Sequence, residues 1–157
     1  MSLSMISDAA SSARRHPTRL VQAARSVLAR ARRGAFATRS ADGSPLGSLL
    51  RFACRDLSPL VALPPTSGHA ENLAQDLRAS LLVADPECAT APDRGIRVTL
   101  VGRACLESGH AAEAARSALE APAEHLIYRI EVESIRVASS DGSVELTLDG
   151  TTTEPGR

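Results

Sequence analysis

The chain has 157 residues, which fits one domain, and its formal net charge of zero at neutral pH speaks against bulk attraction to nucleic acid or an anionic membrane. All 18 basic residues are arginines, so the sequence excludes a Schiff-base lysine and a phosphate-loop lysine. The only aromatic residues are Phe36, Phe52 and Tyr128, too few for a platform on which nucleic-acid bases stack.

The first part of the chain predicts a flexible segment and then a helix. Residues 1–16 are small and polar, and we expect them to be flexible. A helix is predicted to begin at Pro17 and to end at Gly34, because proline suits the first helical turn and glycine suits a helix end. Its apolar residues recur at helical spacing: Leu20, Val21, Ala24, Val27, Leu28 and Ala31.

Strand patterns dominate the rest of the sequence. Strands are predicted over 35–40 and 46–54, joined by an Asp42-Gly43 turn that is typical of hairpins. A strand over 59–63, a short helix over 68–77 and a strand over 79–85 follow. After a loop, a strand is expected over 96–107, in which Gly102 indicates a bulge. The pattern ends with a surface helix over 109–122, a strand over 125–139 and a short strand over 143–150.

This succession predicts the fold class. The strands follow one another through short turns with few crossovers, which favours antiparallel pairing. Two or three helices are too few to cover both faces of a parallel sheet. We therefore predict a mainly β fold, an antiparallel closed or split β-barrel with peripheral helices, in a single domain over 17–150 that is followed by a flexible tail over 151–157.

The cysteines and the chain start bear on the compartment. Cys54, Cys88 and Cys105 are widely spaced and form no paired motif, so we expect buried thiols in a reducing compartment rather than a metal or redox site. The first residues lack the apolar core of a signal peptide, and no apolar run approaches the roughly 20 residues of a membrane helix. A cytoplasmic protein without membrane or nucleic-acid partners is the expectation.

Three stretches, in this order and spacing, are similar to a known family: RRGAFATRSADGSPLGSLLRFA, LVALPPTSGHAENLAQDLRASLLVAD and RVTLVGRACLE. They resemble the pyridoxamine 5′-phosphate oxidase-like FMN-binding split barrels, and among these the branch that includes haem-utilisation proteins. The resemblance covers residues 24–107 and, more loosely, 125–137. It implies a small antiparallel barrel, usually a homodimer, that binds a flavin in the groove between its subunits.

The stretch TSGHAEN marks the start of the predicted short helix, where unpaired N–H groups and a partial positive charge stabilise an anion. Ser67 has the chemistry of a helix N-cap. The resemblance implies that Ser67 and His69 match the family's phosphate-contacting loop and that Asn72 matches a polar helix position. The residues alone also allow an alternative. In it, Ser67 only caps the helix, and His69 and Asn72 are solvated side chains.

Two strands supply further candidate cofactor-binding residues through the same resemblance. Ser48 matches a strand position that faces the flavin phosphate or ribityl chain, and its alternative is a polar residue on an outer strand face. Arg97 and Thr99 share one face of a strand that is expected to line the flavin. The planar fork of arginine suits directed hydrogen bonds, although Arg97 is equally compatible with a surface position beside Asp93.

Together these features favour an FMN-binding oxidoreductase that acts on an unidentified small molecule, with no catalytic residue assigned and no metal site expected. Haem and a deazaflavin both rank behind FMN; for haem the reason is that no histidine follows Ser139 as a ligand. A non-catalytic binding or sensing module of the same fold is the alternative, since Pro64 and Pro65 remove two N–H groups from the phosphate loop. A homodimer is expected, because pairing would enlarge the limited core of a small barrel.

Overall fold

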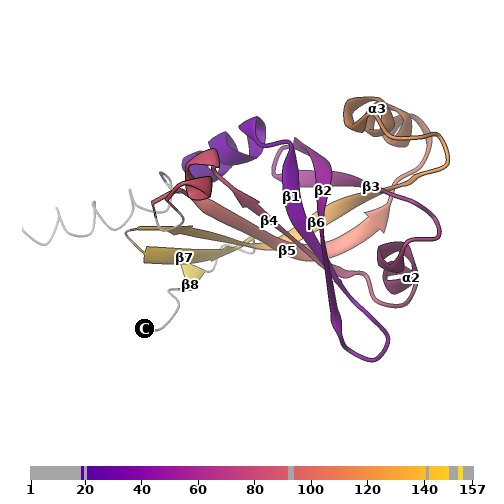
Figure 1. Cartoon of the computed structure of the whole chain (residues 1–157), viewed down its shortest axis with the longest axis horizontal. Coiled ribbons are helices and arrows are strands. Elements are labelled where there is room, and N and C mark those ends of the chain that lie inside the picture. The colour runs from indigo at the N-terminus through magenta and orange to yellow at the C-terminus, as the bar shows by residue number, and fades with distance from the viewer. Residues whose placement is uncertain (1–18, 20, 92–93, 141, 149–151, 154–157) are drawn as a thin grey trace, which may run out of the picture.

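A computed structural model describes residues 19, 21–91, 94–140, 142–148 and 152–153. Six strands form a closed antiparallel barrel in the order β3-β2-β1-β4-β5-β6, which the pairing of β3 with β6 closes (Figure 1). The barrel strands are β1 (Arg33–Arg39), β2 (Pro45–Arg55), β3 (Ser58–Leu63), β4 (Arg78–Ala84), β5 (Arg97–Leu106) and β6 (Leu126–Ser139). The predicted mainly β fold with an antiparallel barrel is confirmed.

The chain end adds two strands outside the barrel. β6 continues past the barrel and pairs with β7 (Gly142–Thr147), which pairs with β8 (Thr152–Thr153). β8 falls within the predicted flexible tail, because two threonines carry no periodic pattern that would predict a strand. The predicted flexible segment 1–16 and the rest of the predicted tail lie outside the described residues.

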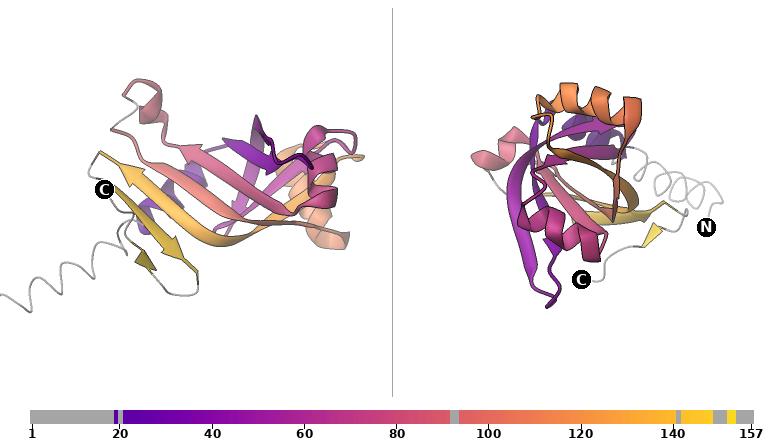
Figure 2. Two further views of the ribbon diagram at one scale, coloured as in Figure 1. Left: turned by 90° about the horizontal axis from the view of Figure 1, so that it is seen from below. Right: turned by 90° about the vertical axis from the view of Figure 1, so that its right-hand side faces the viewer.

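Three helices lie around the barrel within the described residues. A helix over 21–30 leads into β1, and its Ala24, Val27 and Leu28 are buried in the barrel core. α2 (Gly68–Gln75) lies across the opposite end of the barrel, and α3 (Gly109–Leu119) runs along the outside over β2, β3 and β6 (Figure 2). A single 3-10 turn, η1, spans Pro86–Ala89. None of the described helices is long and apolar enough to cross a membrane.

The barrel interior is apolar and closely packed. Alternation in the strands sends every second side chain inward, and the largest fully buried ones include Phe36, Leu81, Leu100, Ile130 and Ile135. A smaller cluster of Ala112, Ala115, Leu119 and Ile127 lies under α3. Burying one such large side chain stabilises the fold by about 1.5–3 kcal/mol, so this interior is the main source of stability.

One predicted helix boundary is wrong, because Gly34 lies inside β1 and does not end the first helix. A Cβ atom at Gly34 would lie 2.9 Å from Leu81 Cδ1 and 2.9 Å from the Leu82 carbonyl oxygen. The glycine therefore lets β4 approach β1 closely. A helix-ending glycine and a close-packed strand glycine look the same in a sequence, since neither has a side chain.

The predicted bulge at Gly102 is confirmed. The pairing of β5 with β6 shifts register between Val101 and Gly102. A Cβ atom on Gly102 would lie 2.0 Å from the Glu131 carbonyl oxygen and 2.9 Å from Val132 Cα. Since these atoms belong to the backbone of the paired strand, no side-chain movement could relieve the clash.

Gly102→Ala should therefore destabilise the protein by about 3 kcal/mol, because it overpacks a strand pair. Gly47→Ala is the matched control: Gly47 lies in β2, and a Cβ atom there meets nothing within 4 Å. This control should leave stability unchanged or raise it by about 0.5–1 kcal/mol. Urea unfolding of both variants measures the difference, and equal stabilities would contradict the role assigned to Gly102.

Candidate functional site

α2 begins directly after Ser67, as the TSGHAEN stretch predicts. Ser67 has extended backbone angles, and its Oγ accepts a hydrogen bond from the Ala70 N–H at 3.2 Å, so it is the N-cap of α2. The Ser67 N–H donates to the carbonyl of Pro64 at 3.0 Å, which joins the Pro-Pro turn to the helix. Because the cap uses only a lone pair of Ser67, the hydroxyl proton can still be donated to a ligand.

His69 is buried where α2 meets β1 and β2, with 5% of its surface exposed. Its Nδ1 is 2.8 Å from the Thr38 Oγ1, and its Nε2 is 2.9 Å from the Ser48 Oγ. Asn72, also buried, donates from Nδ2 to the same Thr38 oxygen at 3.0 Å. The imidazole also packs on Phe36, with 5.0 Å between ring centroids. One network of side chains thus ties α2 to two strands.

The donors and acceptors of this network favour one order of hydrogen bonds. Asn72 Nδ2 can only donate, so Thr38 Oγ1 accepts from it and has its own proton to give. Both His69 tautomers are compatible with this contact, because Thr38 Oγ1 has a second lone pair, but the tautomer protonated on Nε2 also gives the buried Thr38 proton an acceptor at Nδ1. The Nε2–H then donates to Ser48 Oγ, and Ser48 keeps its proton for a further acceptor. The network therefore presents Ser48 as a hydrogen-bond donor.

The same geometry defines what His69 itself can do. Burial lowers the pKa of His69 below its ordinary value, which favours the neutral ring that the network requires. Both ring nitrogens are already bonded, so the imidazole orients Ser48 and has no nitrogen to offer a ligand. A contact between His69 and a phosphate stays a prediction, and the geometry leaves that contact to the backbone N–H.

Several donors lie at or next to one corner, the start of α2. They are the hydroxyls of Ser48 and Ser67 and the N–H groups of Gly68 and His69, which have no carbonyl partner within the helix. Leu46 supplies an apolar wall, since a Cβ atom on Gly68 would lie 3.1 Å from its Cδ2. This arrangement suits a ligand group that carries only acceptors, such as an oxyanion.

Arg97 and Thr99 are not brought to this corner within one chain. Both side chains alternate onto the outer face of β5, where Thr99 pairs with Leu82 and Leu82 pairs with Ala35 of β1. Ser48, by contrast, pairs with the buried Phe36 and shares the inner face. Their cofactor contact stays a prediction, and it would need a second subunit.

The outer face of β1, β2, β4 and β5 carries exposed apolar side chains. Three large side chains stand on it: Leu49 is 69% exposed, Leu82 41% and Val101 41%. Register places Leu49 beside Ala35, and Ala35 beside Leu82, in one row across three strands. Exposed apolar residues that are contiguous across strands mark interaction surfaces.

The described residues offer neither a reactive thiolate nor a metal centre. Cys54, Cys88 and Cys105 are free cysteines. Burial raises the pKa of the Cys54 and Cys105 thiols, which keeps them protonated and poorly nucleophilic. No three His, Cys, Asp or Glu side chains in the described part of the chain are grouped to hold a metal ion.

Sequence reasoning missed Thr38, the residue that links Asn72 to His69. Thr38 is 4% exposed and alternates onto the inner face with Phe36. The signal was present in the alternation of the first predicted strand, where a hydroxyl occupies an inward position. A buried hydroxyl needs a partner, so this position should have pointed to a polar network.

The stability of the protein is expected to fall as pH drops below about 6.5. Unfolded His69 titrates near its ordinary pKa of 6.5 and folded His69 lower, so the unfolded state takes up the proton first. The contribution of the neutral His69 to the free energy of unfolding is fully present above about pH 6.5 and is progressively lost below it. Urea unfolding between about pH 5.5 and about pH 7.5 should show this loss.

His69→Gln should remove this component of the pH dependence, whereas His110→Gln, on the exposed face of α3, should retain it. An unchanged slope in the His69 variant would contradict the neutral imidazole.

Solved structures similar to this chain include a heme binding protein from Mycobacterium smegmatis, with a TM-score of 0.74 and 26% identity over 82% of this chain and 57% of that one. A protein of unknown function from Agrobacterium tumefaciens str. C58 has a TM-score of 0.68 and 25% identity over 85% and 60%. An FAD-binding protein from Mesorhizobium loti, at 23% identity over 73% and 91% and a TM-score of 0.58, shares the fold. The chain thus spans less than two thirds of the first two structures.

No curated protein matches the chain. The sequence model of a family described as pyridoxamine 5′-phosphate oxidase matches residues 20–148, which is most of the chain. Two of these neighbours carry the name of a ligand, heme for the one from Mycobacterium smegmatis and FAD for the one from Mesorhizobium loti, and all three share the barrel described here. The chain therefore belongs to the pyridoxamine 5′-phosphate oxidase family of split barrels.

Proposed function

We propose that this protein binds FMN and acts as a flavin-dependent oxidoreductase on a small molecule. The observation that carries the proposal is the cluster of hydrogen-bond donors at the start of α2, with Ser48 oriented by His69. A flavin phosphate has only acceptors to present, which matches this cluster. Membership of the family supports a flavin over other phosphate-bearing ligands.

The corner fits a phosphate through neutral donors. Ser48, Ser67 and the first N–H groups of α2 would hold the phosphate oxygens, and the helix dipole would favour their charge. Arg39, at the end of β1, is compensated by an ion pair with Asp76 at 3.3 Å. A bound flavin supplies the hydride chemistry, and the chain's residues bind and orient it.

A homodimer would complete the site. The exposed apolar row that includes Leu49 and Leu82 is the surface proposed to pair two subunits. Arg97 and Thr99 lie on the same outer face of the barrel, so an interface there would carry them towards the partner's cofactor. This accounts for why one chain does not assemble all the predicted cofactor-binding residues.

Haem binding is a second candidate, favoured by the 26% identity to the heme binding protein from Mycobacterium smegmatis. It ranks second because of the histidines in the described residues. His69 cannot ligate iron while both its ring nitrogens are hydrogen-bonded. His110 is exposed at the start of α3, and His125, half-buried, lies beside the end of α3, so neither is in the barrel interior.

The purified protein should bind FMN, seen as flavin absorbance and as a rise in Tm with added FMN. Ser48→Ala should weaken FMN binding about tenfold or more, because it removes one hydrogen bond to a charged group, which contributes about 1.5–3 kcal/mol. Ser26→Ala, on the exposed face of the helix over 21–30, is the matched control and should bind normally.

No stabilisation by FMN, or equal affinity in the two serine variants, would contradict the flavin assignment. If FMN does not bind, titrating haemin and a deazaflavin in the same assay tests whether either of them is the ligand. A Soret shift with haemin and no response to FMN would favour the second candidate.

Leu49→Asp should convert a dimer to a monomer, since it places a charge in the proposed apolar interface. Leu106→Asp is the control, because Leu106 is 60% exposed at the end of β5, beyond the apolar row. Light scattering after gel filtration measures the mass of each variant. A monomeric unsubstituted protein would remove both the interface and the shared flavin groove.

A further inference from the structure

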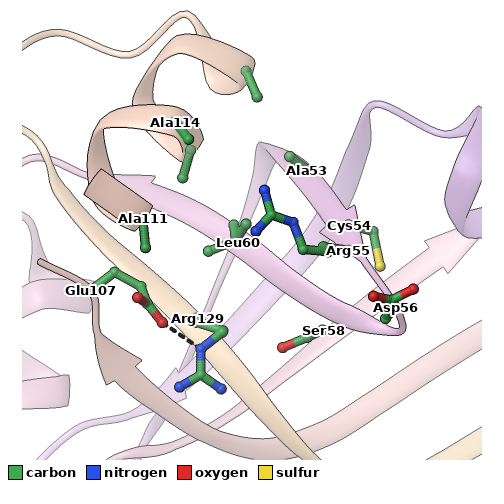
Figure 3. Close-up of a pocket in the computed structure, with 12 residues that line it drawn as sticks. Ala53, Cys54, Arg55, Asp56, Ser58, Leu60, Glu107, Ala111, Ala114 and Arg129 are labelled. Carbon is green, nitrogen blue, oxygen red and sulfur yellow. Dashed lines mark hydrogen bonds and ion pairs between the residues drawn. The ribbon is translucent and has the colours of Figure 1, made fainter. Parts of the chain in front are cut away.

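A pocket of about 470 Å³ lies between α3 and the outer face of β2, β3 and β6 (Figure 3). Its size falls within the roughly 300–1,000 Å³ of small-ligand sites. We call it the α3 pocket; it is lined by Ala53, Cys54, Arg55, Asp56, Ser58, Leu60, Glu107, Ala111, Ala114, Ala115, Ala118 and Arg129. It is separate from the corner at α2, because Arg55 lies seven residues along β2 from Ser48, about 24 Å, and on the opposite face.

The walls of the α3 pocket are apolar and short. α3 buries Ala112, Ala115 and Leu119 against the sheet, whereas Ala111 and Ala114 line the pocket beside this contact. Opposite them, Ala53 and Leu60 are paired residues of β2 and β3 and form the apolar floor. Since no lining side chain from α3 is longer than a methyl group, the helix leaves a hollow that it does not fill.

Four charged residues line the pocket: Arg55, Asp56, Glu107 and Arg129. Arg129, on β6, is neutralised by an ion pair with Glu107 and by another with Glu131 at 3.0 Å. The Arg55 side chain has no hydrogen bond or ion pair to another residue in the described ranges. Figure 3 shows its guanidinium extending from β2 over the pocket towards Leu60 and α3, with the Asp56 carboxylate on the far side of the turn.

The turn that carries Arg55 holds it in place. Asp56 and Leu57 have φ values of 48° and 65°, which are the left-handed angles of a two-residue hairpin turn. Directly before them, Arg55 pairs with Ser58, whose Oγ donates to the Ile130 carbonyl at 3.0 Å. The base of the Arg55 side chain is therefore fixed at the mouth, while its exposed guanidinium is open to a ligand.

We propose that the α3 pocket binds an amphiphilic monocarboxylate, a small molecule with an apolar body and a single carboxylate. The apolar body of the ligand would lie between the alanines of α3 and Leu60, where its surface is removed from contact with water. The carboxylate would accept two parallel hydrogen bonds from the Arg55 guanidinium, whose fork matches its geometry.

The test uses decanoate as the probe, titrated into the full-length protein by calorimetry. Decanoate should bind, whereas decylamine, with the same chain and a cationic head, should not. Arg55→Gln should weaken decanoate about tenfold or more, because the charged hydrogen bonds are lost. The matched control is Arg103→Gln, which lies on the outer face of β5 outside the pocket lining and should bind within about twofold of the unsubstituted protein.

Ala114→Phe fills the pocket from an exposed helix position, so it should fold normally and lose decanoate binding. Circular dichroism checks the fold of each variant. The proposal is overturned if decanoate binds more weakly than about 1 mM, if decylamine binds equally, or if the two arginine variants match. FMN binding in Ala114→Phe and decanoate binding in Ser48→Ala should both be normal, so this proposal and the flavin proposal can fail separately.

Discussion

A buried imidazole has to satisfy both of its nitrogens, and this requirement organises one end of the barrel. In an apolar interior, a polar group without a hydrogen-bond partner lowers the stability by about 1–3 kcal/mol. His69 is therefore buried where each of its two ring nitrogens has a hydrogen-bond partner. Thr38 and Ser48 are these partners, from adjacent strands. The helix that carries His69 is only eight residues long, too short to be stable alone, and the network holds it in place. The position of α2 thus follows from hydrogen-bond satisfaction as much as from apolar packing.

The polarity of that network has a chemical consequence at the surface. Asn72 can only give a proton to Thr38, and each later bond follows in turn until Ser48 is left as a donor. With the ring proton on Nε2, the Ser48 hydroxyl can give its own proton to an acceptor atom of a ligand. Because the neutral ring is needed to relay this order, the pKa of His69 and the character of the site are linked: the burial that lowers the pKa also keeps the relay intact.

The parts of this protein that sequence could predict are those encoded locally. Strand alternation, the Asp42-Gly43 turn and the bulge at Gly102 each depend on neighbouring residues, and all three agree with the structure. Thr38 could not be paired with His69, because 31 residues separate them and only barrel closure brings them together. Ser67 showed its capping chemistry directly, whereas the burial of His69 depended on where α2 packs. The strand that contains Arg97 could be predicted from the sequence. The position of Arg97 relative to α2 could not, because it depends on the register between β4 and β5.

The two prolines before α2 are compatible with an anion site. They remove N–H groups at positions 64 and 65, but the donors at the corner begin at Ser67, after the turn. Pro64 contributes its carbonyl instead, which accepts a hydrogen bond from the Ser67 N–H at 3.0 Å and so positions the N-cap residue. Fixed φ angles at Pro64 and Pro65 also restrict the unfolded loop, so less conformational entropy is lost when the turn forms. The prolines thus preorganise the start of α2, and the donors proposed to bind the anion, from Ser67 onwards, are unaffected by the two missing N–H groups.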